Sequence, residues 1–227
     1  MLPCCATTST SLSAVPLPDR CAIVFDLDDT LYPERDFVIS GFRAVSAVAE
    51  GEIGESVYEL LIELFDAGHD EPLGEVCRRF HLLSPLHELI EVYRNHFPSI
   101  RLAPPAARLL DQLKSRQHPL GLLTDGRSTT QRNKIRALGL EVWIDEIVIS
   151  EEFGSAKPAE RNYRHFETRF DQKNLVYVGD NPAKDFHTPN RLGWTTVGVR
   201  DCGNHIHTQA ADFSADALPQ HWIERLA

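Results

Sequence analysis

The chain has 227 residues, of which 42% are hydrophobic and 25% charged, and its formal net charge is −10. This composition is typical of a soluble globular protein, and no apolar stretch approaches the roughly 20 residues that span a bilayer. Duplex nucleic acid is itself a dense polyanion, and the chain has no concentrated Lys/Arg run. We therefore expect neither nucleic acid nor a membrane as a partner.

The N-terminal segment, residues 1–20, is rich in Ser, Thr, Pro and Ala. It lacks the basic and the long apolar regions of a secretory signal, so we predict a disordered tail there and a cytoplasmic location. The five cysteines are irregularly spaced, which argues against a disulfide framework and for reduced thiols. Only Cys202, His205 and His207 resemble metal-ligand spacing, and without a second Cys/His pair we do not expect zinc there.

Five short apolar runs along the chain each end in a polar residue. Their hydrophobicity is continuous rather than alternating, which is typical of strands buried on both faces of a parallel sheet. The runs cover residues 22–25, 120–123, 147–149, 175–178 and 195–199. Helices are predicted at residues 106–117, 129–138, 159–170 and 182–192, the last shortened or kinked by Pro189. This order predicts a doubly wound, Rossmann-like α/β core in which ligands bind beyond the carboxyl ends of the strands.

The stretch from about Pro33 to Pro98 contains no strand signal. Apolar residues recur there at helical spacing in four consecutive sets, which predicts four amphipathic helices packed into a small domain. We therefore divide the chain into an α/β core, residues 21–32 and 99–227, and an all-helical domain, residues 33–98, inserted after the first strand of that core.

The strongest local motif runs from Asp26 to Thr30, directly after the first predicted strand, with the sequence Asp-Leu-Asp-Asp-Thr. In extended backbone, residues two apart point the same way, so Asp26 and Asp28 can face one site. Two carboxylates held together repel each other, and a proton or a cation must relieve them.

A second acidic pair, Asp180 and Asp185, follows the predicted strand at residues 175–178. Oxygen-rich clusters of this kind suit Mg²⁺, a hard cation that often takes one or two carboxylates plus water and substrate phosphate. Acidic residues that offset a helix dipole are the alternative interpretation of this pair taken alone.

Two further motifs supply groups that bind or neutralise phosphate. The sequence Thr124-Asp125-Gly126-Arg127 ends a predicted strand and leads into a helix, where a hydroxyl and exposed backbone N–H groups form a natural phosphate cradle. Lys157 stands directly before a predicted helix and can supply positive charge. An anionic substrate on a chain of net charge −10 requires such local cations.

In order and spacing these four motifs resemble those of the haloacid dehalogenase-like (HAD) hydrolase superfamily. They stand here as Asp26–Thr30, Thr124, Lys157, and Gly179-Asp180 with Asp185. The resemblance extends from about Cys21 to the C-terminus, and a helical insertion between the first and second motifs is typical of the branch with a C1-type cap. The sequence of the first motif and its flanks, from Phe25 to Tyr32, is most similar to that of the phosphatase and nucleotidase members.

The resemblance implies a role for each motif residue. Asp26 would attack phosphorus and form an aspartyl-phosphate, and Asp28 would act as the general acid and base. Mg²⁺ would be held by Asp26, the backbone carbonyl of Asp28 and Asp180, supported by Asp185. Thr124 and the N–H groups of Asp125 and Gly126 would bind phosphoryl oxygens, and Lys157 would neutralise charge. Arg127 would contact a second anionic group of the substrate or lie in solvent.

The expected activity is Mg²⁺-dependent hydrolysis of a small phosphorylated metabolite, a sugar phosphate or a nucleoside monophosphate. A phosphomutase of the same superfamily stays open, as does a catalytically idle protein of this fold. In this superfamily, phosphonate hydrolysis uses a lysine of the cap as a Schiff base, and the chain has no Lys between Cys21 and Pro105. A dinucleotide site is not expected either, because no Gly-x-Gly-x-x-Gly motif follows a predicted strand. The sequence leaves the physiological substrate and the oligomeric state open. Besides Arg127, the candidates for substrate choice are Tyr32, Glu34, Arg35, Phe37 and Asn133.

Overall fold

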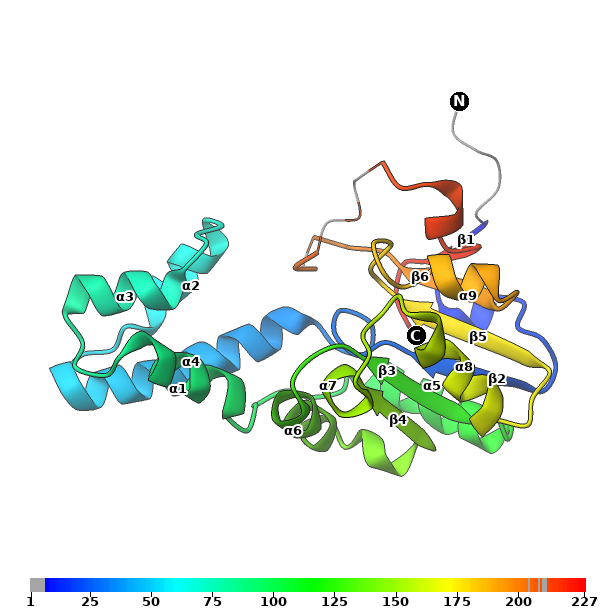
Figure 1. Cartoon of the computed structure of the whole chain (residues 1–227), viewed down its shortest axis with the longest axis horizontal. Coiled ribbons are helices and arrows are strands. Elements are labelled where there is room, and N and C mark those ends of the chain that lie inside the picture. The colour runs from blue at the N-terminus through cyan, green and yellow to red at the C-terminus, as the bar shows by residue number, and fades with distance from the viewer. Residues whose placement is uncertain (1–6, 204, 208, 210–211) are drawn as a thin grey trace.

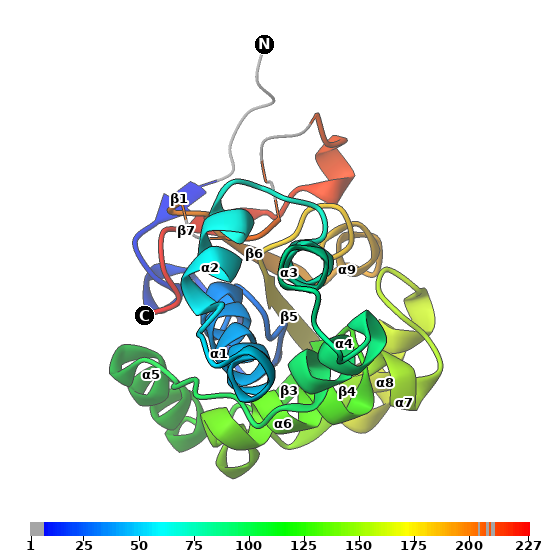
Figure 2. The same ribbon diagram turned by 90° about the vertical axis from the view of Figure 1, so that its left-hand side faces the viewer.

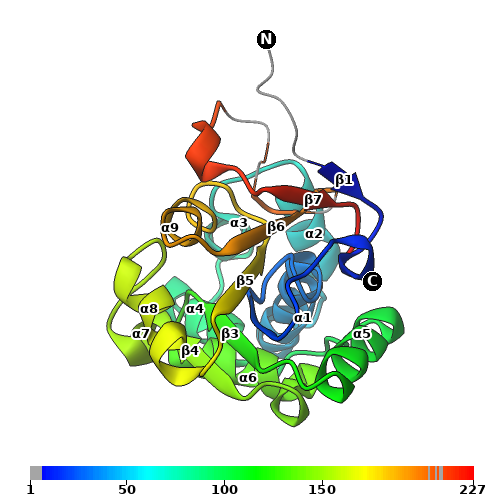
Figure 3. The same cartoon turned by 90° about the vertical axis from the view of Figure 1, so that its right-hand side faces the viewer.

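The structure is a computed structural model that describes residues 7–203, 205–207, 209 and 212–227. Its centre is a seven-stranded, wholly parallel sheet in the order β1-β7-β6-β5-β2-β3-β4 (Figures 1 and 3). The strands are β1 (Thr7–Ser9), β2 (Cys21–Phe25), β3 (Leu120–Thr124), β4 (Glu146–Ile149), β5 (Asn174–Gly179), β6 (Thr195–Val199) and β7 (His221–Ile223). The five predicted strands and the α/β fold class are confirmed.

Helices cover both faces of the sheet, as the continuous apolar runs of the strands require. Along β2 the side chains alternate between the two faces: Ile23 and Phe25 pack with the helices of one face, and Ala22 and Val24 with those of the other. The first face carries α5 (Pro104–Ser115) and α6 (Ser128–Leu138), and the second carries α7 (Ser150–Phe153), α8 (Glu160–Arg169) and α9 (His187–Arg191).

The strand order reverses beside β2, and this reversal places the site. After β2 the chain moves outward through β3 and β4, then returns to β5 on the other side of β2. Strands β2 and β5 are joined at their carboxyl ends, where the Asp26 N–H donates to the Val178 carbonyl at 2.8 Å. A ligand crevice is expected where the order reverses, at the carboxyl ends of the strands.

Four consecutive helices between β2 and α5 extend away from the sheet (Figures 1 and 2). They share a hydrophobic cluster of their own, which includes Phe42, Leu61, Val76 and Leu89. The last of them rests on α6 through hydrogen bonds such as that from Thr130 Oγ1 to the Arg94 carbonyl, 2.9 Å. The four helices are α1 (Glu34–Ile53), α2 (Tyr58–Asp66), α3 (Pro72–Phe80) and α4 (Leu86–Asn95).

The N-terminal segment differs from the predicted disordered tail over residues 7–20. Strand β1 pairs in parallel with β7 at the edge of the sheet, and a short 3₁₀ helix, Leu12–Ala14, follows it. Leu12 is fully buried and packs into the core, which accounts for the order of this segment. The first six residues of the predicted tail lie outside the described residues.

The last predicted helix is also shorter than expected. Instead of residues 182–192, α9 covers His187–Arg191, and the preceding residues form a turn in which the N–H groups of Lys184 and Asp185 donate to the Asn181 carbonyl. That turn carries Asp185 back toward the strand end. Within the described residues, no helix has the length and apolar character needed to cross a membrane.

Candidate active site

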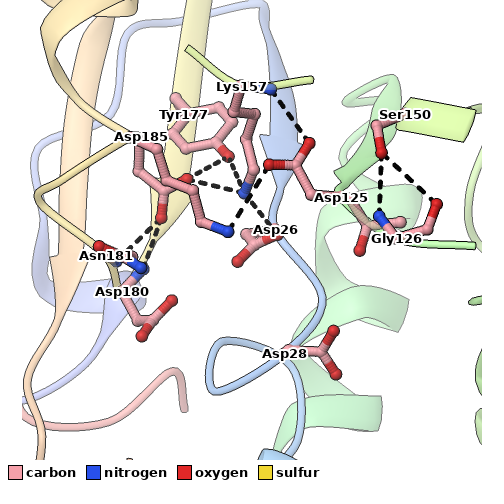
Figure 4. A network of polar contacts seen from close by, with 12 residues as sticks. Asp26, Asp28, Asp125, Gly126, Ser150, Lys157, Tyr177, Asp180, Asn181 and Asp185 are labelled. Atoms are coloured by element: carbon pink, nitrogen blue, oxygen red, sulfur yellow. Dashed lines mark hydrogen bonds and ion pairs between the residues drawn. The ribbon is translucent and has the colours of Figure 1, made fainter. Parts of the chain in front are cut away.

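A buried ion-pair network occupies the carboxyl ends of β2 and β5 (Figure 4). Lys157 Nζ lies 2.7 Å from Asp26 Oδ1 and 2.7 Å from Asp185 Oδ1, and it donates to the Tyr177 hydroxyl at 3.2 Å. The other oxygen of Asp185 accepts the N–H groups of Asp180 and Asn181, at 3.2 and 2.9 Å. These contacts hold two aspartates and one lysine rigidly at the strand ends.

Gly179 makes this close approach possible. A Cβ atom at that position would lie 2.6 Å from Asp185 Oδ2, closer than real Cβ atoms come to other atoms. The glycine of the Gly179-Asp180 motif therefore has a packing reason: it lets the Asp185 carboxylate lie against the end of β5.

Asp26, Asp180 and Asp185 offer carboxylate oxygens that all lie within 4.8 Å of one another. Asp180 Oδ2 is buried and makes no hydrogen bond within the described part of the chain; the imidazole nitrogen His205 Nδ1 lies 3.5 Å from it. An unsatisfied buried carboxylate oxygen is costly unless something else coordinates it. The three carboxylates carry −3 and Lys157 carries +1, so the cluster fits a divalent cation.

The electrostatics of Asp26 agree with that fit. Burial raises the pKa of Asp26 well above the ordinary value of an aspartate; Lys157 opposes the shift, and Asp185 and Asp180 reinforce it. Although burial favours a neutral amine, Asp185 and Asp26 hold the pKa of Lys157 well above its usual range. A metal ion in this cluster would favour the ionised form of Asp26, which is the form that can act as a nucleophile.

The carboxylate of Asp28 points away from this network and has a different set of partners (Figure 4). It lies 2.7 Å from Lys134 Nζ, accepts a hydrogen bond of 2.5 Å from the Tyr32 hydroxyl, and accepts another of 3.1 Å from Gln131 Nε2. The Lys134 ammonium also lies over the ring of Phe37, 4.3 Å from its centre. Asp28 is thus held by α6 and by the segment that leads into α1.

These partners stabilise the carboxylate form of Asp28. Burial raises the pKa of Asp28, but the charge and hydrogen bond of Lys134 together with the hydrogen bonds from Tyr32 and Gln131 outweigh burial and lower that pKa below its ordinary value. Sequence reasoning named Tyr32 and Phe37 as substrate candidates and missed Lys134 and Gln131 as partners of the site. No motif signal distinguished these two from other polar residues of a predicted helix.

Thr124 lies at the end of β3 with its side chain at the site. Its hydroxyl oxygen accepts a hydrogen bond of 2.5 Å from Gln131 Nε2, which leaves the hydroxyl proton available to a phosphoryl oxygen. Asp125 accepts the Lys157 N–H at 3.0 Å and lies 3.6 Å from Lys184 Nζ. The Gly126 N–H, predicted as a phosphate ligand, donates instead to Ser150 Oγ at 2.9 Å.

Arg127 is turned away from the site. Its guanidinium lies 2.7 Å from Glu91 of α4, and the two side chains are 47% and 46% exposed. Asn133 likewise bonds the backbone of this region, donating to the carbonyls of Asn95 and His96 at 3.0 and 3.1 Å. Arg127 and Asn133 therefore connect the helical insertion to α6, and neither lines the cavity described next.

A cavity of about 160 Å³ opens at the strand ends. It is lined by Asp26, Asp28, Glu34, Thr124, Asp125, Asp180, Asn181, Lys184 and His207. Burial raises the pKa of Glu34, at the start of α1, to about 7; Asp28 adds to the shift and Lys134 opposes it. Two further residues that the sequence suggested for substrate choice, Arg35 and Phe37, do not line this cavity. Arg35 pairs with Asp66 at 2.5 Å, and Phe37 packs against Lys134.

The segment after β6 also reaches the site. The Ile206 N–H donates to Asp29 Oδ2 at 2.9 Å, and Gln209 Nε2 donates to the Asp180 carbonyl at 2.7 Å. His205 lies beside Asp180, and His207 lines the cavity. Cys202 is exposed, and its thiol contacts the Glu224 carbonyl, so the three residues with metal-like spacing do not gather around one point. The cysteines within the described residues, Cys21, Cys77 and Cys202, are free thiols.

Comparison with known families identifies the class of protein. Residues 23–199 match the family model for haloacid dehalogenase-like hydrolases. The chain therefore belongs to this family. Its structure superposes on a HAD hydrolase of Bacillus subtilis, YfnB, solved bound to magnesium, with a TM-score of 0.65 and 19% identity over 92% of this chain and 96% of that one. At that identity the likeness shows the fold.

Relatives of this chain are named as phosphatases. The glyceraldehyde 3-phosphate phosphatase of Methanopyrus kandleri is 30% identical over 79% of this chain and 83% of its own. The ribulose-1,5-bisphosphate 5-phosphatase of Halopiger xanaduensis is 27% identical over 90% of this chain and 95% of its own. The prediction of a HAD-like phosphatase is confirmed by these matches.

Proposed function

We propose that the protein is a magnesium-dependent phosphatase that hydrolyses small phosphate monoesters, of the sugar-phosphate type, through an aspartyl-phosphate on Asp26. The observation that carries this proposal is the buried cluster of Asp26, Asp180 and Asp185, in which the Lys157 ammonium lies 2.7 Å from both Asp26 and Asp185. The relatives named as phosphatases of glyceraldehyde 3-phosphate and ribulose 1,5-bisphosphate support phosphorylated sugars as the substrate class.

The first half-reaction transfers the phosphoryl group to the chain. A carboxylate oxygen of Asp26 attacks phosphorus, the bond from phosphorus to the ester oxygen breaks, and Asp28 gives its proton to the departing alkoxide. Thr124 donates its hydroxyl proton to a phosphoryl oxygen, and Lys157 offsets the charge near Asp26. Asp28 must be protonated for this step, although Lys134 and Tyr32 favour its ionised form in the structure.

The second half-reaction releases phosphate. The Asp28 carboxylate takes a proton from water, whose oxygen attacks the aspartyl-phosphate, and the bond from phosphorus to Asp26 breaks. The ionised Asp28 in the structure is suited to this step. A bound magnesium ion would neutralise the phosphoryl oxygens, and the residues that would hold it are Asp26, the Asp28 carbonyl and Asp180, with Asp185 behind them. An oxygen-only set of ligands favours Mg²⁺ over the softer transition metals.

We also propose that residues 33–98 are a cap of the C1 type. Support comes from the position of the insertion, between the first and second motifs, and from its separate hydrophobic cluster. Its first helix begins at the cavity with Glu34, and its last helix lies against α6.

Phosphate release from an aryl phosphate and from a panel of sugar phosphates and nucleotides tests the proposed function. We expect turnover by the wild type with Mg²⁺, none with EDTA, and none by Asp26→Asn. Asp171→Asn, which changes an exposed aspartate before β5, is the matched control and should retain full activity. Acid-quenched enzyme should carry hydroxylamine-labile phosphate only when Asp26 is present. Activity that survives in Asp26→Asn would refute the assignment of the nucleophile.

A further inference from the structure

Glu34 is an acidic residue that lines the cavity at the start of the helical insertion. Glu34 is the first residue of α1, and its N–H donates to Asp29 Oδ1 at 2.7 Å, which fixes the start of the helix at the site. Its side chain lines the cavity and makes no hydrogen bond or ion pair to any residue that the structure describes. Negative charge in a first helical turn is favoured by the helix dipole. Here the acidic side chain also lines the cavity, together with Asp28, the residue proposed to protonate the leaving group.

The lysines around the cavity are each paired with a carboxylate. Lys157 lies between Asp26 and Asp185 at 2.7 Å from both. Lys134 is 2.7 Å from Asp28, and Lys184 is 3.6 Å from Asp125.

The arginine that could have bound a second anion is engaged elsewhere. Arg127 pairs with Glu91 at 2.7 Å and does not line the cavity. Beyond the phosphoryl group, a substrate therefore meets Glu34 and the imidazole of His207 rather than a guanidinium or an unpaired ammonium of the described lining.

We infer that the site takes phosphate monoesters whose leaving group is uncharged and bears hydroxyl groups, and that Glu34 selects against a second anionic group. This inference rests on the proposed phosphatase function, and it sets this chain apart from the relative named for ribulose 1,5-bisphosphate, a substrate with a second phosphate. Glu34 would accept a hydrogen bond from a substrate hydroxyl, which satisfies a carboxylate that otherwise has no partner in the described structure. A second carboxylate or phosphate on the substrate would instead meet like charge.

Like-charge repulsion at this position is large enough to set specificity. Two unit charges a few Å apart at a partly screened site repel strongly enough to change a rate constant by roughly tenfold or more. A site that uses a hydrogen bond to a substrate hydroxyl also discriminates more sharply than an apolar pocket does. Glu34 is therefore a specificity-determining residue, distinct from the residues that act on phosphorus.

Two substrates of matched size test this assignment: glycerol 3-phosphate and 3-phosphoglycerate. Both carry a terminal phosphate on a three-carbon chain, and they differ in a hydroxymethyl group versus a carboxylate. At about pH 9, where Glu34 is ionised, we expect the wild type to show a roughly tenfold higher kcat/KM for glycerol 3-phosphate. In Glu34→Gln that ratio should fall by about the same factor, chiefly through faster hydrolysis of 3-phosphoglycerate. Glu50→Gln, an exposed change on the same helix, should leave the ratio unchanged.

The outcomes separate the two levels of the proposal. Hydrolysis of neither ester, nor of any panel substrate, would overturn the proposed function itself. Equal hydrolysis of both esters by the wild type would overturn the role of Glu34 while the phosphatase assignment stands. An unchanged ratio in folded Glu34→Gln would do the same. The wild-type ratio is decisive even if Glu34→Gln does not fold.

Discussion

The two aspartates of the first motif stand two residues apart, in opposite electrostatic surroundings. Asp26 shares the buried cluster with Asp180 and Asp185, and its pKa is raised well above the ordinary value. Asp28 is surrounded by donors, and its pKa is lowered. The first group needs a cation to become a good nucleophile, whereas the second is already held in the form that accepts a proton from water.

The origin of each environment differs as well. The groups around Asp26 are Asp180 and Asp185, which follow β5, and Lys157, in the loop before α8, all within the α/β core. The partners of Asp28 come from α6 and from Tyr32, where the chain leaves the core for the helical insertion. Because Phe37 of α1 packs against Lys134, the surroundings of Asp28, the proposed acid/base group, depend on the position of the insertion, and those of Asp26, the proposed nucleophile, do not.

Replacement of Lys157 should have the largest effect on activity and stability, because it removes the cation that pairs with Asp26 and Asp185. Lys157→Met leaves Asp26, Asp180 and Asp185 without their shared cation, and we expect kcat to fall by at least about 10³-fold. Removing one partner of a buried ion pair should also lower the free energy of unfolding by about 3–5 kcal/mol at pH 7. Urea unfolding and steady-state kinetics measure the two effects.

The pH dependence of that stability loss identifies its cause. Since the pKa of Asp26 is raised in the fold, protonation at lower pH removes part of the carboxylate repulsion. The destabilisation should therefore be smaller at pH 5 than at pH 7. Lys173→Met, at an exposed lysine before β5, should match the wild type. A stable and active Lys157→Met would contradict the described network.

Replacement of Lys134 should act mainly on the other aspartate, Asp28. Without that ammonium the pKa of Asp28 rises, so the ascending limb of the kcat–pH profile should move to higher pH. We expect a loss in kcat of roughly 10- to 100-fold near neutral pH, with aspartyl-phosphate accumulating, because proton transfer to Asp28 limits release. Lys134→Arg keeps the charge and should keep the limb near its wild-type position. If Lys134→Met leaves the profile unmoved, Lys134 does not govern Asp28.

The strands and the motif residues were predictable because their signals are local. Each long strand is a continuous apolar run, and Asp26, Thr124 and Asp180 directly follow three of them. In contrast, β1 and β7 are three-residue strands with the sequences Thr-Thr-Ser and His-Trp-Ile. Segments so short carry no periodicity, and pairing between opposite ends of the chain creates them.

The partners of the motif residues could not be predicted, because contacts distant in sequence define them. Lys134 and Gln131 belong to a predicted helix in which they resemble solvent-exposed residues. They are buried because the insertion packs on α6. Both contact Asp28, from which they are separated by 103 and 106 residues in the sequence. Arg127 adjoins the predicted phosphate cradle, yet Glu91 on the insertion holds it elsewhere.

Raising the pH should strengthen the discrimination by Glu34, at the start of the insertion, against substrates with a second anionic group. Its pKa is raised to about 7, so it is largely neutral at pH 6 and largely ionised at pH 8. Burial is the main cause of the raised pKa of Glu34; Asp28, Asp29 and Asp180 add to the shift, and Lys134 opposes it. The preference for glycerol 3-phosphate over 3-phosphoglycerate should increase about fivefold between these pH values. Both esters carry the same phosphate, so its own titration cancels in the ratio, and a ratio independent of pH would exclude titration of Glu34.

The smallest effect is expected at Arg127, on the contact that joins the insertion to the core. Its ion pair with Glu91 is about half exposed, and exposed pairs contribute little. Asn133 and Thr130 hold α4 on α6 independently of it. Arg127→Ala should therefore change kcat/KM for a sugar monophosphate by less than about twofold and leave Tm unchanged.

A sugar bisphosphate makes the Arg127 measurement decisive. If Arg127 stays with Glu91 during turnover, the variant and the wild type should hydrolyse the bisphosphate equally slowly. A selective loss of tenfold or more on that substrate would mean that Arg127 leaves Glu91 and binds the second phosphate. Glu91 of the insertion would then be a partner that Arg127 exchanges for the substrate. In that case the core would position the proposed nucleophile, and the insertion would control how the rest of the substrate is recognised.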